Sequence, residues 1–203
     1  MDPKSPKQEA LGEEEVLSSR FVAHLFPFRE GASFETLYEA AKASSPKADH
    51  YPYALLAGET RKSSDDGEPG GSAGRPMLAL LEERGIDCAL LVVARYFGGR
   101  KLGIPRLRRS FLSASEQAIA HAEYLVLRTY KSYRIRLSYS LYEQWKSVAL
   151  RRGYRILSPR YGEEVEAEIL GDATMASAFA PFLRAGGALV PLGEKKQWEE
   201  IKE

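Results

Sequence analysis

Three carboxylates and four glycines occupy one short segment ahead of a predicted helix, Asp65-Asp66-Gly67-Glu68-Pro69-Gly70-Gly71-Ser72-Ala73-Gly74-Arg75-Pro76. Glycines allow backbone N–H groups to converge on an anion, and the N-terminus of the following helix adds about half a positive charge. The segment therefore predicts an anion pocket; the alternative interpretation is a flexible turn whose acids cap the helix. This candidate loop site consists of Asp65, Asp66, Gly67, Glu68, Gly70, Gly71, Ser72 and Gly74.

Other chemistries are conceivable for the same loop. No Lys-Ser or Lys-Thr pair follows its last glycine, so the spacing does not match a nucleotide-hydrolysing P-loop. Asp65, Asp66 and Glu68 are the ligand type that a hard cation such as Mg²⁺ prefers, although no histidine or calcium-loop spacing accompanies them. We expect no cofactor, with Mg²⁺ at this loop as the alternative.

A second polar segment follows the apolar run that ends at Ala94. Two aromatic side chains lie between cations beside a glycine pair, an arrangement suited to stacking on a base or lying along a phosphate backbone. The aromatic rings could equally cover the end of the strand. The candidate anion- or nucleic-acid-binding residues here are Arg95, Tyr96, Phe97, Gly98, Gly99, Arg100 and Lys101, together with Arg75 of the first segment.

Three more arginines, Arg106, Arg108 and Arg109, fall in the first turns of the helix predicted after Gly103, where the helix macrodipole disfavours positive charge. Either an external anion or salt bridges to the Asp65 to Glu68 loop would offset this charge. The formal net charge is only +1, so no global field attracts the chain to nucleic acid or membrane. A local basic patch can still bind nucleic acid without sequence preference.

No catalytic triad can be named from the sequence. His24 and His121 fit structural roles, and no serine near Asp65 has a base placed beside it. The single cysteine, Cys88, excludes an intramolecular disulfide, and its apolar neighbours favour a buried, inert thiol over a reactive one.

Hydrophobic periodicity predicts two domains, 13–124 and 125–193. The first is expected to contain a strand over 21–28 covered on both faces, a helix capped by Ser33, a strand over 51–56, an irregular loop over 57–74, a helix from Pro76 to Gly85, a strand over 88–94 and a helix over 105–122. The second reads as β-α-β-β-α-β, a ferredoxin-like order. The α+β chain is expected to be cytosolic, with frayed polar ends at 1–12 and 193–203.

Two long motifs in this order resemble the YigZ/IMPACT family: Ser-Ser-Asp-Asp-Gly-Glu-Pro-Gly-Gly-Ser-Ala-Gly-Arg-Pro at 63–76 and Leu-Val-Val-Ala-Arg-Tyr-Phe-Gly-Gly-Arg-Lys-Leu-Gly at 91–103. The resemblance covers about 15–193. It implies a ribosomal-protein-S5 domain 2-like first domain and a second domain similar to one of elongation factor G. It also implies a loose link to translation and, for bacterial members, to nucleic acid, but no established reaction.

The chain departs from the family pattern at two places. Ile104-Pro105-Arg106-Leu107-Arg108-Arg109 stands where the family usually continues with a glycine pair, so a backbone N–H is lost at Pro105 and charge is gained. Tyr51-Pro52 replaces the family's usual Asn-Cys. We expect either an altered ligand or arginine contacts in place of a glycine-backbone contact to it.

These observations lead to three functional hypotheses. The first is a cytosolic protein that binds RNA or a translation-associated partner through the basic segment. The second is an enzyme acting on a small anionic substrate with Asp65, Asp66 or Glu68 as acid, base or metal ligand. The third is a protein-interaction module that uses exposed aromatic residues among Tyr133, Tyr139 and Trp145.

Overall fold

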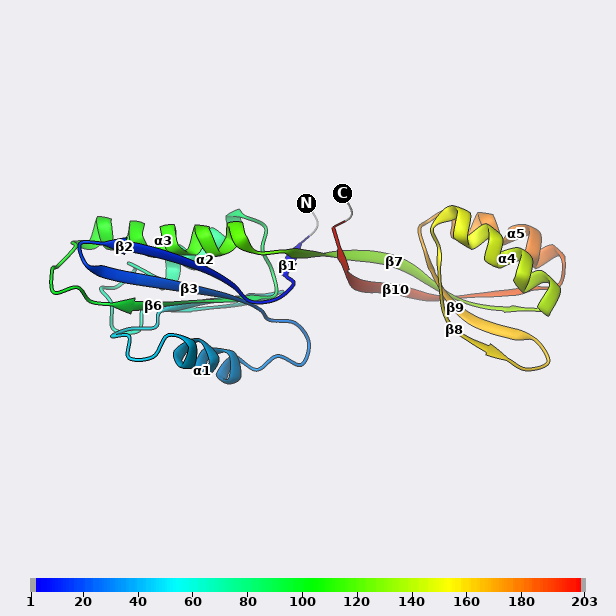
Figure 1. The fold of residues 1–203 in the computed structure, drawn as a ribbon. Helices are drawn as coiled ribbons and strands as arrows, with labels where there is room; N and C mark the ends of the chain where they lie inside the picture. The colour runs from blue at the N-terminus through cyan, green and yellow to red at the C-terminus, as the bar shows by residue number, and fades with distance from the viewer. Residues whose placement is uncertain (1–2, 202–203) are drawn as a thin grey trace. The chain divides into compact units, whose positions relative to one another are not determined.

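The computed structural model describes residues 3–201 as a mixed α/β chain with two compact units (Figure 1). One unit contains the described residues up to Leu127 together with those from Glu199, and the other is Arg128–Trp198. Two long strands, β7 (Tyr124–Leu137) and β10 (Ala188–Glu200), have residues in both units. No helix within residues 3–201 is long and apolar enough to cross a membrane.

The first unit is built on an antiparallel sheet with helices on both faces (Figure 1). Its strand order is β2 (Ala10–Val16), β3 (Ser19–Pro27), β6 (Ala89–Tyr96), β4 (Tyr53–Ala57), β5 (Thr60–Ser64). Helices α2 (Gly74–Glu83) and α3 (Ile104–His121) cover one face, and α1 (Phe34–Ser44) covers the other.

The central strands are apolar on both faces because both faces are covered. On β3, Phe21, Ala23 and Leu25 belong to the core beneath α2 and α3, whereas Phe26 belongs to the core beneath α1. The predicted strand with two buried faces is therefore confirmed. At the start of α1 the Ser33 hydroxyl accepts a hydrogen bond from the Thr36 N–H, as the capping pattern indicated.

The prediction of a frayed end at 1–12 is wrong for the described residues. β1 (Lys4–Pro6) pairs with the start of β7, and β2 pairs with β3 along its whole length. Strand β2 packs so closely on α3 that a Cβ at Gly12 would lie 2.2 Å from the Ala114 carbonyl oxygen. The run Glu13-Glu14-Glu15 hid this strand: Glu13 and Glu15 are exposed on one face, and Glu14, on the face toward α3, accepts a hydrogen bond from Ser113.

Two further expectations need correction in the first unit. The loop predicted over 57–74 contains strand β5, which pairs with β4, and only 65–73 are irregular. Cys88 lies just before β6 with φ 49° and is half-buried rather than fully buried. Burial, reinforced by Asp87, raises the pKa of its thiol.

The second unit has the β-α-β-β-α-β order of elements. After β7 come α4 (Tyr139–Arg152), β8 (Arg155–Tyr161), β9 (Val165–Gly171), α5 (Met175–Arg184) and β10, and the sheet order is β10-β7-β9-β8. The frayed end predicted from residue 193 is wrong as far as Glu200, where β10 ends; residues 202–203 lie outside the described chain. Trp145 is fully buried against Phe179 and Phe182, so it is no exposed interaction residue.

Candidate functional site

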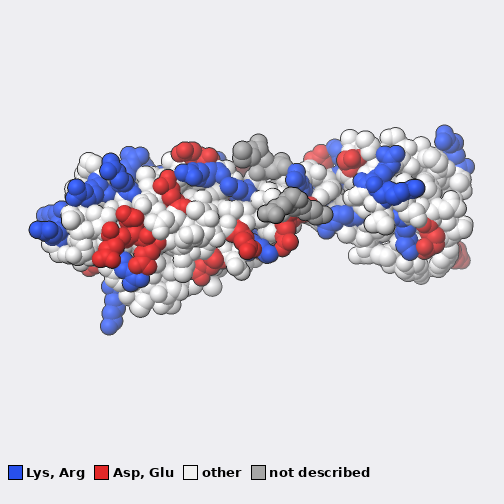
Figure 2. All heavy atoms as spheres, turned by 45° about the horizontal axis from the view of Figure 1, so that its top comes forward, with Lys and Arg blue, Asp and Glu red and all other residues white. Residues whose placement is uncertain are grey.

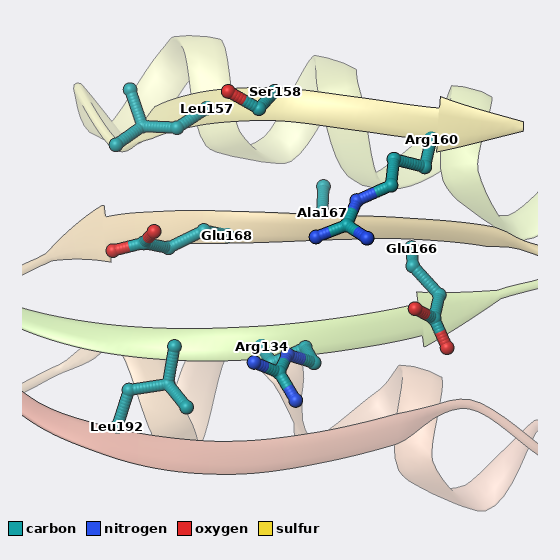
Figure 3. A pocket seen from close by; sticks show the side chains of 8 residues that line it. All are labelled: Arg134, Leu157, Ser158, Arg160, Glu166, Ala167, Glu168 and Leu192. Atoms are coloured by element: carbon teal, nitrogen blue, oxygen red, sulfur yellow. The ribbon is translucent and has the colours of Figure 1, made fainter.

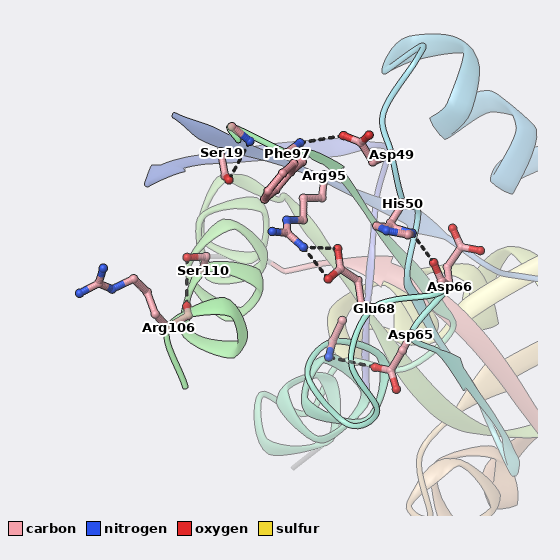
Figure 4. A network of polar contacts seen from close by, with 12 residues as sticks. Ser19, Asp49, His50, Asp65, Asp66, Glu68, Arg95, Phe97, Arg106 and Ser110 are labelled. Atoms are coloured by element: carbon pink, nitrogen blue, oxygen red, sulfur yellow. Dashed lines mark hydrogen bonds and ion pairs between the residues drawn. The ribbon is translucent and has the colours of Figure 1, made fainter. Parts of the chain in front are cut away.

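The two polar segments meet at an ion pair between Arg95, near the end of β6, and Glu68 of the glycine-rich loop (Figure 4). Arg95 Nη1 donates to Glu68 Oε1 and Oε2 at 2.6 and 2.5 Å. The side chains are only 9% and 1% exposed. A charge pair this deeply buried requires close hydrogen-bonded partners, so each residue fixes the position of the other.

Aromatic rings flank the guanidinium of Arg95. Its Cζ lies 5.6 Å from the ring centroid of Phe21, in the core, and 5.6 Å from that of Phe97, which is 48% exposed. The Phe97 N–H donates to Asp49 Oδ2 at 2.7 Å. This hydrogen bond fixes the backbone of Phe97 at a position where its ring is exposed at the surface. Tyr96, the preceding residue, packs instead against the core under α1, and its hydroxyl donates to the Pro46 carbonyl.

Asp49 and His50, which the sequence analysis did not select, complete this part of the site. The Asp49 N–H donates to the Arg95 carbonyl, and the Arg95 N–H donates to the His50 carbonyl. His50 Nδ1 donates to the Asp66 carbonyl at 2.6 Å, which leaves Nε2 of the neutral ring as an acceptor. No periodic pattern marks these two residues, because long-range pairing with β6 places them here.

The glycine-rich loop is closed by its own carboxylates. Asp65 Oδ1 accepts from the N–H groups of Ala73 and Gly74 at 3.0 and 2.8 Å, and Oδ2 accepts from Gly71 at 2.8 Å. Burial would raise the pKa of Asp65, but these three backbone bonds outweigh it and lower the pKa. The N-terminus of α2 therefore already holds an anion, which agrees with the capping interpretation for Asp65.

The remaining loop residues have structural contacts. Asp66 Oδ2 accepts from the Tyr51 N–H at 2.6 Å, and the backbone of Gly74 lies so close to Ser64 that a Cβ would approach it to 2.7 Å. Gly67 lies against the His50 ring, and the hydroxyl of Ser72 is buried with no hydrogen-bond partner within residues 3–201. Gly70 has open space around it. Across the described chain, no group of three His, Cys, Asp or Glu side chains could hold a metal ion.

A cavity of about 460 Å³ opens beside the ion pair. Charged and polar residues line one part of it and apolar residues another. Its lining consists of Asp49, His50, Gly67, Glu68, Pro69, Arg95, Phe97, Lys101, Leu102, Gly103, Ile104 and Leu107. The cavity thus joins the loop site, the end of β6 and the start of α3.

Of the other predicted cations, Lys101 lines this cavity, and the rest lie at the surface of the neighbouring segments. Arg75, Arg100, Lys101, Arg106, Arg108 and Arg109 are all exposed, and within residues 3–201 none has a carboxylate within 4.0 Å of its charged nitrogens. Figure 4 shows Arg106 pointing away from the Arg95–Glu68 pair, and Figure 2 shows blue side chains gathered around the end of the first unit where β6 leads into α3. Helix α3 has no side-chain cap at Gly103. The salt bridges considered between these arginines and the acidic loop do not form.

The second unit has a smaller hollow, of about 90 Å³, on the sheet face away from its helices (Figure 3). Arg134 of β7, Arg160 of β8 and Glu166 and Glu168 of β9 line it. Glu168 accepts from Ser132 and Lys195, and the Ser132 bond is the main cause of its lowered pKa. Acids and cations alternate on this face of the second unit.

Comparison with known proteins gives concordant matches. The Impact N-terminal domain model matches residues 17–119. An IMPACT family member of Haemophilus influenzae is 32% identical over 162 residues, covering 74% of this chain and 79% of that protein. YvyE of Bacillus subtilis, described as an IMPACT family member, is 28% identical over 177 residues, covering 85% and 82%. A crystal structure described as a hypothetical protein matches with a TM-score of 0.62 at 25% identity, covering 100% of this chain and 99% of that one.

Proposed function

The chain belongs to the IMPACT family, and we propose that its first unit binds RNA through the cations around the end of β6 and the start of α3. The observation that carries this proposal is the absence, within residues 3–201, of carboxylate partners for Arg100, Lys101, Arg106, Arg108 and Arg109. These five cations all lie between Arg100 and Arg109 in the sequence. Cations clustered in this way, with no carboxylate partner within residues 3–201, are available to an external polyanion.

Phosphate contacts would supply most of the affinity. Each Lys or Arg that neutralises a phosphate releases condensed counterions, so binding weakens linearly in log–log form as salt rises. The uncapped N-terminus of α3 adds backbone N–H groups and a partial positive charge beside the same arginines. A local patch of this kind acts at short range, which is compatible with a net charge of only +1.

The fold assignments of the sequence analysis belong to the same proposal. A ferredoxin-like second unit is supported by its element order and by the sheet order β10-β7-β9-β8. A ribosomal-protein-S5 domain 2-like first unit is supported by the family resemblance together with its antiparallel sheet and paired helices α2 and α3. Both assignments fit a protein that works with the translation apparatus in the cytoplasm.

The competing hypotheses have less support. An enzyme that uses Asp65, Asp66 or Glu68 needs free carboxylates, but Asp65 caps α2, Asp66 binds the Tyr51 N–H and Glu68 is paired with Arg95. A protein-interaction site in the second unit cannot use Trp145, because this residue is buried in the core, although Tyr139 is 51% exposed. RNA binding uses the groups that lack partners.

The test is a salt titration of binding to a fluorescently labelled, mixed-sequence RNA. We compare the wild type with Arg106→Ala/Arg108→Ala/Arg109→Ala. Loss of three phosphate contacts should reduce the slope of log affinity against log salt by about 2, because each contact contributes roughly 0.7 with single strands. The matched control is Arg151→Ala/Arg152→Ala/Arg184→Ala in the second unit, which makes the same change in charge and should leave the slope unchanged. Equal binding by all three proteins, or no binding at low salt, overturns the proposal.

A further inference from the structure

We infer that the cavity beside Arg95 and Glu68 accepts one unstacked nucleobase, so that the protein prefers single-stranded RNA to duplex. The inference rests on the proposed function and adds to it the class of RNA and the part of it that is recognised. It is carried by three properties of the cavity: an exposed aromatic wall, a buried polar floor with unused hydrogen-bonding capacity, and a lysine, Lys101, in the lining.

The walls suit a flat aromatic ligand. Phe97 is 48% exposed and Ile104 is 55% exposed, and both line the cavity together with Leu102 and Leu107. Exposed apolar side chains at a cavity entrance are covered when a base stacks between them, and such stacking is tolerant of base identity because every base has a π-face. The Asp49 carboxylate holds the Phe97 backbone, so the ring is positioned before the ligand arrives.

The floor offers hydrogen-bonding groups that no other group within residues 3–201 uses. Both contacts of Arg95 to Glu68 come from Nη1, so Nη2 of this cavity-lining arginine has no hydrogen-bond partner within residues 3–201. Its N–H groups can donate to a ligand acceptor. His50, with Nδ1 held by the Asp66 carbonyl, presents Nε2 as an acceptor to the same cavity. A base edge carries both donors and acceptors, and therefore complements this pair.

A cation in the cavity lining can bind a phosphate of the nucleotide whose base enters the cavity. Lys101 lines the cavity, and the preceding residue, Arg100, is exposed. A nucleotide whose base enters the cavity would bring a phosphate to Lys101. A base within a duplex cannot enter unless it unpairs and unstacks, at a penalty of a few kcal/mol. The expected preference for single strands follows from that penalty.

The experiment uses the full chain and three ligands with the same phosphates: a single-stranded RNA, its duplex, and the same strand with the bases removed from an internal run. The wild type should bind the intact single strand at least about 10-fold more tightly than either other ligand. Phe97→Ala should abolish this preference, and Ile104→Ala should reduce it, whereas Phe97→Trp should retain it. Leu150→Ala, at a side chain 82% exposed in the second unit, is the control and should behave as wild type.

The outcomes separate the two proposals. Equal wild-type affinity for all three ligands, with no effect of Phe97→Ala, overturns the base pocket and leaves RNA binding by the cations intact. Absence of binding to any of them at low salt overturns both. A preference for the single strand that survives in Phe97→Ala and Ile104→Ala also overturns the pocket, because stacking would then occur elsewhere. Far-UV circular dichroism of each variant establishes that it is folded.

Discussion

Arg95 reaches both carboxylate oxygens of Glu68 through a single nitrogen, Nη1, and so joins the glycine-rich loop to the end of β6 across 27 positions of the chain. The two charges compensate each other, and both side chains are buried from water. Burial makes the pair costly to break, because either charge left alone would be desolvated without compensation.

We therefore expect Glu68→Gln to lower the free energy of unfolding of the first unit by about 3–5 kcal/mol. Glu68→Leu/Arg95→Met should recover most of that loss, since an apolar pair avoids the desolvation of charge. Urea unfolding followed by circular dichroism measures the change. Both tryptophans, Trp145 and Trp198, lie in the second unit, so their fluorescence serves as an internal control and should not change. Equal stability of the single and double variants would contradict this account.

The capping carboxylate of Asp65 predicts a pH dependence. Its pKa is lower in the folded chain than its ordinary value near 3.8, so the stabilisation it gives is present above that value and is lost as pH falls through the folded pKa. Asp65→Ala should reduce the unfolding free energy at neutral pH by about 0.5–2 kcal/mol, the usual range for a lost cap. The difference between wild type and variant should shrink below about pH 4 in acid titrations of stability. A difference that stays constant down to pH 2 would exclude this role.

Adjacent glycines in the second polar segment should respond differently to substitution. A Cβ at Gly98 would lie 2.1 Å from the Ser18 carbonyl carbon, whereas Gly99 has φ +80° and open space around it. Gly98→Ala should lower the unfolding free energy by about 3 kcal/mol, because β6 must move away from the β2–β3 turn. Gly99→Ala should lower it by about 1–2 kcal/mol, the penalty of a left-handed conformation. Thermal unfolding of the two variants ranks them, and the reverse order would be inconsistent with this packing.

The raised pKa of the Cys88 thiol predicts that it reacts slowly with alkylating agents. Burial is the main cause and the Asp87 charge the next, so less thiolate is present near pH 8 than in a free cysteine. Iodoacetamide should alkylate the folded chain more slowly than the urea-unfolded chain, and Asp87→Asn should increase the folded rate. The rate is measured by mass spectrometry against pH. Unchanged pH dependence in Asp87→Asn would show that the aspartate charge has no influence.

Where short-range interactions determine the fold, the elements could be predicted from the sequence. Ser33 caps α1 as its spacing to Thr36 requires, and the apolar run after Cys88 becomes β6 because both of its faces are covered. The family resemblance, drawn from the motifs at 63–76 and 91–103, is confirmed by the matching domain model.

Long-range contacts determine the rest. Strand β2 has few apolar residues to mark it, and it exists because Gly12 permits its backbone to lie against α3. Asp49 and His50 are brought to the site by backbone pairing with Arg95 and by their side-chain bonds to the Phe97 N–H and the Asp66 carbonyl. The sequence could not decide whether Asp65 and Glu68 would pair with Arg106, Arg108 and Arg109. In the structure Asp65 accepts from backbone N–H groups and Glu68 accepts from Arg95, so neither acid pairs with these arginines.

The unpaired cations at the start of α3 have a consequence for the free protein. They repel one another and oppose the helix macrodipole, so the unliganded chain carries an electrostatic strain that dissolved ions relieve. Rising ionic strength should therefore stabilise the first unit against unfolding, whereas it should weaken the proposed binding of RNA. The stability of the first unit and its proposed affinity for RNA would then change in opposite directions with salt.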